Sequence, residues 1–415
     1  MSVQAISQLK RVFIIGSFLR KDHPLLAAKL RQAVRRGAQL SVLNATDDDL
    51  LMPLANKLIA APGEWTSMLG EVAVAIAQSR NIAAPAELAS LQPSATAKQI
   101  AAGLMSGEPR AILLGNAAAQ HPQAAQLHAI AQWIAENTAA QFGYLTEAAN
   151  TVGGYLANAL PSTGVNAKAL FEQPRKAYLL LHAEPEFDCA DPQAARAALE
   201  QAEMVVVMSP FKQGMDYADV LLPIAPFSET SGTFVSAEGR AQGFNGTVRP
   251  LGDPRPGWKV LRVLGNLLAL DGFNYDSSEE IRNEVLGTKT LESLDLSSRL
   301  NNLANIKLEV PQTVQGLQRV ADVPVYFSDA IVRRAPALQE TRDARVPKAV
   351  LPAALAEQLG VSEGATVRVT QGKASVVLGC EIDDSLPANV VRLAAAHPST
   401  TALGSMFGSL SVEKA

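Results

Sequence analysis

Two short apolar segments that each end in glycine restrict the possible folds of this chain more than any other feature. The first, residues 11–16, is followed by helical spacing over residues 24–36 and by a further apolar strand at residues 39–43. This order predicts a βαβ unit with parallel strands and a right-handed crossover. The second segment, residues 110–115, leads into a helix at residues 124–138. The repeated order of strand, turn and helix predicts an α/β fold.

The length of the chain requires more than one folding unit. It has 415 residues, 48% of them hydrophobic, whereas a single hydrophobic core usually stops growing at about 250–300 residues. We expect two Rossmann-like α/β lobes, over residues 1–106 and 107–320.

The last part of the chain has a different pattern, which predicts a small β-barrel domain over residues 321–415. A helix is expected at residues 348–359, because Gly360 follows it as a stop signal. Short apolar strands then follow, at residues 367–369, 374–378 and 390–393.

Charge and cysteine content exclude several classes of protein. The net charge is −4 and the basic residues are scattered, so we expect no nucleic-acid partner. No apolar run reaches the roughly 18–20 residues of a membrane-spanning helix, and no secretory signal is apparent, so we expect a cytoplasmic protein without direct membrane insertion. The two cysteines, Cys189 and Cys380, lie far apart, which excludes a disulfide framework and CxxC-type zinc or iron–sulfur sites within the chain.

The turn after the first strand is the first candidate ligand site. Gly16 stands between a strand and a helix, where α/β folds bind anionic ligands. The bulky Phe18 and Leu19 follow, and there is no G-x-G-x-x-G pattern, so a structural turn is favoured over a ligand site. The five histidines show no metal-site spacing and no serine lies in a nucleophile elbow. We therefore expect no metal site and no catalytic nucleophile.

A segment rich in Pro, Gly, Ser and Thr, residues 218–242, carries the most specific pattern. A strand runs into a turn, and Glu, Gly, Thr, Glu, Arg and Gln then follow at close spacing. Physical reasoning alone favours a Glu–Arg pair that braces this loop over acid–base chemistry, because such chemistry needs a perturbed pKa.

This segment resembles the corresponding loop of the molybdopterin oxidoreductase superfamily. The family pattern A-D-V-x-L-P, then E-x-x-G-T-x-x-x-x-E-G-R-x-Q, is matched between Ala218 and Gln242. The similarity extends to Asn150 and Gly154 and to residues 177–185, and it covers essentially residues 11–415. It implies the two-lobed formate dehydrogenase-like fold with a C-terminal barrel, which in active members helps to hold a dinucleotide cofactor.

Two departures from active members imply that the molybdopterin site has been lost. Active relatives carry small or amide residues after the first strand, where this chain has Phe18 and Leu19. A following strand of those relatives ends in Asp-Pro-Arg, which holds the guanine of the cofactor, whereas residues 44–46 are Asn-Ala-Thr. The molybdenum ligand and the iron–sulfur segment of relatives lie upstream of the first lobe, so we expect neither cofactor in this chain.

Within the superfamily, these departures are similar to the large 75 kDa subunit of NADH:quinone oxidoreductase, respiratory complex I, in its cluster-free C-terminal portion. This resemblance implies a non-catalytic scaffold whose partners are other subunits of the peripheral arm, which passes electrons from NADH to quinone at the inner (plasma) membrane. The residues that would line the vestigial cofactor cleft are Gly16, Asn150, Gly154, Glu229, Gly232, Thr233, Glu238 and Arg240.

Two alternatives stay open. A surviving molybdenum site would make the protein a molybdopterin-dependent oxidoreductase of the formate dehydrogenase or nitrate reductase kind, or a fragment of one. A stand-alone nucleotide-binding α/β module would make the match at residues 218–242 a coincidence.

Overall fold

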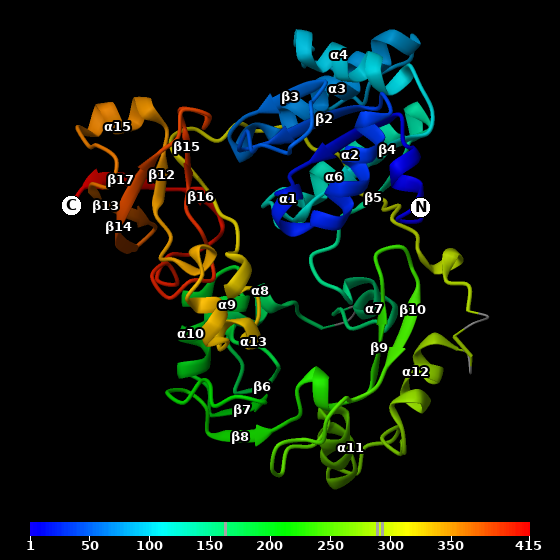
Figure 1. Cartoon of the computed structure of the whole chain (residues 1–415), viewed down its shortest axis with the longest axis vertical. Coiled ribbons are helices and arrows are strands. Elements are labelled where there is room, and N and C mark those ends of the chain that lie inside the picture. Colours follow the sequence, from blue (N-terminus) through cyan, green and yellow to red (C-terminus); the bar gives the residue numbers. More distant parts are fainter. Residues whose placement is uncertain (162–163, 288–289, 292–293) are drawn as a thin grey trace.

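The computed structural model describes residues 1–161, 164–287, 290–291 and 294–415. Its N-terminal part is a five-stranded, fully parallel sheet in the order β3-β2-β1-β4-β5 (Figure 1). The chain moves outward from β1 to β3 and returns to place β4 beside β1, so the strand order reverses between β1 and β4. The strands are β1 (Arg11–Ile15), β2 (Gln39–Asn44), β3 (Asn56–Ile59), β4 (Arg110–Leu114) and β5 (Gln141–Tyr144).

Helices cover both faces of this first sheet. Phe13 and Ile15 of β1 pack into a large core with α3, α4 and α6, whereas Val12 and Ile14 face a second core with α2. Alternate residues of a strand point to opposite faces, so the continuous apolar run of β1 fits a sheet that is buried on both sides. The helices are α2 (Pro24–Arg35), α3 (Trp65–Arg80), α4 (Ala95–Met105) and α6 (Ala124–Thr138).

The boundary expected between residues 106 and 107 lies inside this sheet. Arg110 of β4 is in register with Arg11 of β1, and β5 pairs with β4. The second strand–glycine unit therefore completes the first sheet rather than beginning a new one. The physical reason is that β4 buries both of its faces between the same helices that cover β1.

The middle of the chain contains a second, smaller parallel sheet in the order β6-β7-β8. Helices α8 and α10 cover one face of this second sheet through the core around Tyr178 and Leu199, whereas Leu179 and Leu181 on the other side are exposed. The strands are β6 (Ala177–Leu181), β7 (Met204–Ser209) and β8 (Val220–Pro223), and the helices are α8 (Ala167–Glu172) and α10 (Pro192–Glu200).

An antiparallel hairpin stands beside the second sheet (Figure 1). It joins β9 to β10 and packs against α7 and α12 around Val235 and Leu286. This hairpin contains residues 232–242, the second part of the family-like segment of residues 218–242. Its elements are α7 (Thr151–Leu156), β9 (Gly232–Val235), β10 (Ala241–Phe244) and α12 (Ser278–Leu286), with α11 (Gly257–Leu267) between the last two.

The C-terminal part is a seven-stranded mixed sheet in the order β16-β11-β15-β12-β14-β13-β17. Among the described residues its end strands β16 and β17 do not pair with each other, so the expected barrel is an open sheet. The strands are β11 (Gln318–Val320), β12 (Ala349–Leu351), β13 (Thr366–Gln371), β14 (Ala374–Ile382), β15 (Val390–Arg392), β16 (Phe407–Ser409) and β17 (Ser411–Lys414).

The helix expected at residues 348–359 is shorter than predicted. Ala349–Leu351 forms β12, which pairs with β14 and β15, and the helix α15 spans only Ala353–Leu359. Pro352 stands at the N-cap of α15 and separates the two elements, because its ring disfavours helical geometry in the preceding residue.

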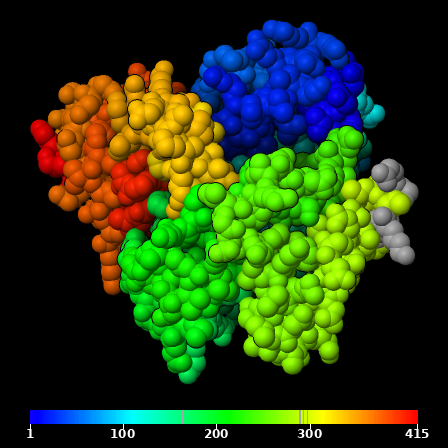
Figure 2. Space-filling view, turned by 60° about the horizontal axis from the view of Figure 1, so that its bottom comes forward, coloured from blue at the N-terminus to red at the C-terminus, as the bar shows by residue number. Residues whose placement is uncertain are grey.

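The first sheet, the middle of the chain and the C-terminal sheet pack against one another. The segment that contains α13 (Ala330–Arg333) lies between the middle of the chain and the C-terminal sheet. In Figure 2 this gold segment lies against the green middle of the chain and the orange C-terminal part. Within the described ranges, no helix combines the length and the apolar character that crossing a bilayer requires.

Candidate functional site

The reversal of strand order between β1 and β4 is where open α/β sheets usually bind ligands. Gly16 follows β1 there with φ of +60°. A Cβ atom at this position would lie 2.5 Å from the backbone nitrogen of Ala118 and 2.8 Å from the Trp65 ring. Only glycine fits so close an approach, and the space beside Gly16 is filled by the protein itself.

Phe18 closes the carboxyl end of the first sheet. Its side chain is 5% exposed, and the charged groups of Arg392 and Lys21 lie 5.2 and 5.3 Å from the centre of its ring. Both distances are within the range of cation–π attraction. Arg392 ends β15, so the C-terminal sheet contributes directly to this closure.

Ion pairs hold the C-terminal sheet in this position. Asp322 accepts from Lys21 Nζ at 2.5 Å and from Arg392 at 3.1 Å, and Arg392 also pairs with Asp48 at 3.0 Å. Burial opposes ionisation of Asp322, but the charges of Lys21 and Arg392 outweigh it and lower its pKa to about 2. The carboxylate therefore stays ionised at neutral pH. We call these four residues, with Phe18, the first closure.

Two buried polar atoms beside the first closure have no hydrogen-bond partner among the described residues, Ser17 Oγ and Asn44 Oδ1. The amide nitrogen of Asn44 donates to the Ser17 carbonyl at 3.1 Å. Both side chains line a hollow of about 10 Å³, which is about the space that one water molecule needs.

The other candidate residues lie in or near the hairpin and the adjoining α7, and not at this sheet end. Asn150 Oδ1 accepts from the backbone N–H of Val235 at 2.8 Å and so fixes the start of α7 against β9, which contains Gly232 and Thr233. The expected bracing of the loop is therefore supplied by an amide side chain. Gly154 lies one turn further along α7, and a Cβ there would meet open space.

The charged candidates of the loop do not pair with one another. Glu238, in the hairpin turn, accepts from the backbone N–H of Val3 at 2.7 Å, and Arg240 beside it is exposed. Glu229 ends a short 3-10 turn. Among the described residues no ion pair joins Arg240 to either glutamate, and no hydrogen bond joins Gly16 to the hairpin. A shared role of these residues in binding remains a prediction.

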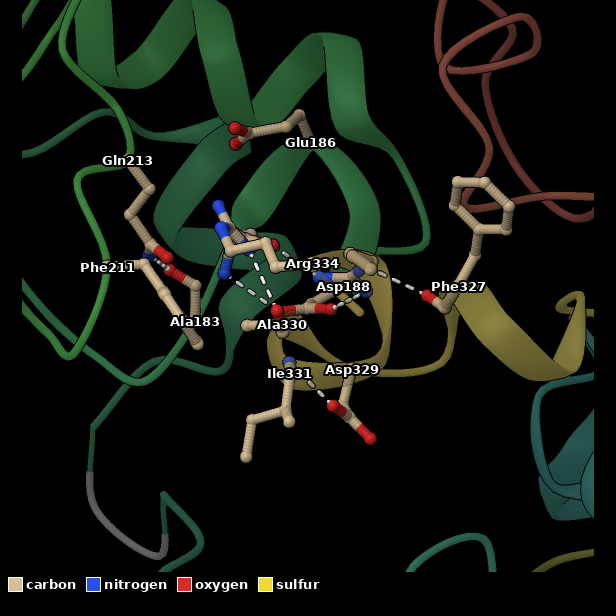
Figure 3. Close-up of polar contacts among 12 residues, drawn as sticks. Ala183, Glu186, Asp188, Phe211, Gln213, Phe327, Asp329, Ala330, Ile331 and Arg334 are labelled. Carbon is tan, nitrogen blue, oxygen red and sulfur yellow. Dashed lines mark hydrogen bonds and ion pairs between the residues drawn. The ribbon is translucent and has the colours of Figure 1, made fainter. Parts of the chain in front are cut away.

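A second buried charge cluster, which sequence reasoning missed, lies at the carboxyl end of the second sheet. Glu184 is only 1% exposed and accepts from Arg333 at 2.7 Å and from Arg334. Arg333 also pairs with Asp188 at 2.5 Å. We call Glu184, Asp188, Arg333 and Arg334 the Glu184 cluster; its two carboxylates balance its two guanidinium groups. Figure 3 shows Asp188 and Arg334 between Gln213 and Phe327.

Hydrogen bonds of the arginines to Glu184 lower its pKa, although burial acts in the opposite direction. The turn that carries it is fixed by Gln213, which donates to the carbonyl of Ala183 at 2.7 Å and accepts from Ser209 at 3.0 Å. The only sequence signals were the adjacent Arg333 and Arg334 and the strand-end turn at residues 182–185, which give no hint that they meet.

Comparison with known proteins assigns the chain to a family. Residues 2–267, well over half of the chain, match the family described as Molybdopterin oxidoreductase. The chain belongs to this family. The family resemblance and the mixed α/β fold expected from the sequence are thereby confirmed.

Individual relatives of this molybdopterin oxidoreductase family member are similar over shorter stretches. A protein of Staphylococcus haemolyticus named "Putative formate dehydrogenase" is 37% identical over 93 residues, which is 22% of this chain and 9% of that protein. A protein of the same name from Staphylococcus aureus is 38% identical over 91 residues, with the same shares. The matches therefore span less than a tenth of these relatives.

A solved structure shares the fold over the whole chain. Acetylene hydratase from Pelobacter acetylenicus superposes with a TM-score of 0.67, at 14% identity, over 100% of this chain and 81% of that chain. At this identity the likeness concerns the fold alone. It places both sheets and the C-terminal part within one known architecture.

Side chains of the chain itself lie at the end of the first sheet, where the sequence predicts a lost pterin site. Phe18 and the neighbours of Gly16 occupy the space beside Gly16. The hollow beside Ser17 and Asn44, on the β2 side, has room for about one water molecule. A ligand of nucleotide size would have to displace Phe18 and separate Arg392 from Asp322. The architecture of the family is present at this point, whereas the cavity is filled by side chains of the chain itself.

Proposed function

We propose that this chain is a non-catalytic scaffold of the molybdopterin oxidoreductase fold, acting as the cluster-free portion of the 75 kDa subunit of NADH:quinone oxidoreductase. The observation that carries the proposal is the first closure, in which Phe18 and its ion-paired neighbours occupy the sheet end used by ligands in α/β folds. The assignment to this complex rests on the sequence resemblance, in which Phe18, Leu19 and residues 44–46 depart from active members of the family.

The proposal includes partners and location. The chain binds other subunits of the peripheral arm and lies on the cytoplasmic side of the membrane through them, and it holds neither iron–sulfur cluster nor pterin. Its contribution to electron transfer from NADH to quinone is structural.

A second candidate function is that of a molybdopterin-dependent oxidoreductase of the formate dehydrogenase kind. The formate dehydrogenase-named relatives favour it, as do the unpartnered oxygens of Ser17 and Asn44 at the sheet end. It requires that the first closure opens to admit the cofactor.

Metal and pterin content of the purified chain tests the two candidates. Molybdenum, tungsten and iron are measured by mass spectrometry, and released pterin is measured by fluorescence after acid oxidation. We expect none in stoichiometric amount. Stoichiometric metal with pterin would overturn the scaffold proposal and support the second candidate.

Native electrophoresis tests whether the chain is part of NADH:quinone oxidoreductase. The tagged chain, produced in its own host, is separated by native electrophoresis and stained for NADH-dependent and formate-dependent dye reduction. We expect the tag to migrate with NADH-dependent activity. Migration with formate-dependent activity would contradict the assignment to NADH:quinone oxidoreductase.

A further inference from the structure

The Glu184 cluster brings together two segments that lie far apart in the sequence. Glu184 follows β6 at the carboxyl end of a parallel sheet, a position where such sheets usually take ligands. Arg333 ends α13 and Arg334 is its C-cap residue. Two guanidinium groups therefore meet one carboxylate in a place from which water is largely excluded.

The two arginines are held by contacts that do not involve Glu184. Arg333 Nε donates to the carbonyl of Phe327 at 2.9 Å, and Arg334 donates to the carbonyl of Ala330 at 3.0 Å. The Arg333 guanidinium lies 4.8 Å from the Phe187 ring centre. These contacts fix the position of the guanidinium groups without the carboxylate.

Arg334 has a corresponding aromatic support, because its guanidinium lies 4.5 Å from the centre of the Phe211 ring. Stacking on aromatic faces and donation to carboxylate or phosphate oxygens are both characteristic of arginine. A pair of guanidinium groups fixed in this way is preorganised for an oxyanion, since little side-chain freedom is lost on binding.

The backbone of Glu184 is likewise held independently of its carboxylate. Its N–H donates to Asp188 at 2.7 Å, the preceding carbonyl of Ala183 accepts from Gln213, and Pro185 is buried. Removing only the carboxymethyl end of the side chain therefore leaves the turn in place and the two guanidinium groups facing a vacated space.

We propose that the carboxyl end of the second sheet is a binding site for a small oxyanion, a carboxylate or a phosphate, and that Glu184 is its internal ligand. The proposal is independent of the scaffold function, because it concerns a different sheet end from the first closure. In the wild-type protein the site is satisfied by the chain itself and does not respond to added anions.

Chemical rescue of Glu184→Ala tests this site, because acetate replaces the deleted carboxymethyl group. The thermal midpoint is measured in 50 mM acetate and in 50 mM inorganic phosphate, each against chloride at equal ionic strength. We expect each anion to raise the midpoint of Glu184→Ala by about 3 °C more than that of wild type, as a ligand of millimolar affinity would.

Matched variants separate rescue from general salt effects. Glu184→Gln keeps the space filled and should respond like wild type. Asp188→Ala removes the more exposed carboxylate and frees one edge of Arg333, so phosphate should raise its midpoint by about 1 °C. This variant also tests the site if Glu184→Ala does not fold. Equal responses of Asp188→Ala and wild type, together with absence of rescue of Glu184→Ala, would overturn the proposal.

Discussion

The two parallel sheets of this chain differ in how they are buried, although their strands are similarly apolar. The first sheet has helices and cores on both faces, the usual condition of a parallel sheet. The second has one core, under α8 and α10, and exposes Leu179 to 46% on the other face. The difference shows that most of the apolar stabilisation lies in the first sheet.

The carboxyl ends of the two sheets are nevertheless closed in a similar way. Each end is closed by charged residues from the last third of the chain, Arg392 and Asp322 at the first sheet and Arg333 and Arg334 at the second. The C-terminal third therefore connects both sheets by closing the places where parallel sheets take ligands.

Replacing one leucine in each sheet by alanine should give the largest difference in the free energy of unfolding. Leu43 of β2 is 0% exposed, so Leu43→Ala should lower the free energy of unfolding by about 3–4 kcal/mol through lost burial and a residual cavity. Leu179→Ala in β6 should cost less than about 1 kcal/mol, because the side chain is already half in water. Urea unfolding measures both, and equal losses would refute the contrast between the sheets.

Disrupting the first closure should have a smaller effect. Asp322→Asn leaves Lys21 and Arg392 without their shared carboxylate, and we expect a loss of about 2–3 kcal/mol at pH 7. The folded pKa of Asp322, about 2, is below its unfolded value, so this stability is complete above about pH 4 and is lost as pH falls toward 2.

The exposed pair of Arg20 and Asp49 supplies the control for the first closure. Asp49→Asn should leave the unfolding midpoint unchanged, because exposed ion pairs contribute little. If Asp322→Asn also leaves the unfolding midpoint unchanged, the first closure does not stabilise the packing of the C-terminal sheet.

Acid should weaken the first sheet through His121, and this is the smallest of the three effects. The ring stacks on Trp65 at 5.3 Å, and its Nε2 lies 2.9 Å from the carbonyl of Pro62. Burial lowers the pKa of His121 to about 4, so its contribution is complete above about pH 6.5 and is lost as pH falls toward 4. Between pH 7 and pH 5 the loss is about 2 kcal/mol.

Urea unfolding of wild type and His121→Gln at the two pH values measures this loss. The variant should be less stable at pH 7 and should show a smaller difference between pH 7 and pH 5. Burial also lowers the pKa values of His128, His182 and His397, so part of the acid effect should persist. An unchanged pH difference in the variant would exclude His121 as its source.

The sequence by itself determined the local elements and the family. Apolar runs such as residues 11–15 and 110–114 form strands whatever their partners, and the loop at residues 218–242 carried the resemblance that the family match confirms. The bulky Phe18 after Gly16 is buried at the sheet end, and the absence of a ligand there stays a prediction.

Only the tertiary structure decided which strands share a sheet and which charges meet. β4 pairs with β1 across the expected boundary at residue 106. This long-range pairing depends on the helices that pack against both strands. Glu184 and Arg333 are hydrogen-bonded although they are 149 positions apart in the sequence, and no local pattern joins them. Periodicity encodes which face of an element is buried, whereas the identity of the partner depends on how the folded layers fit together.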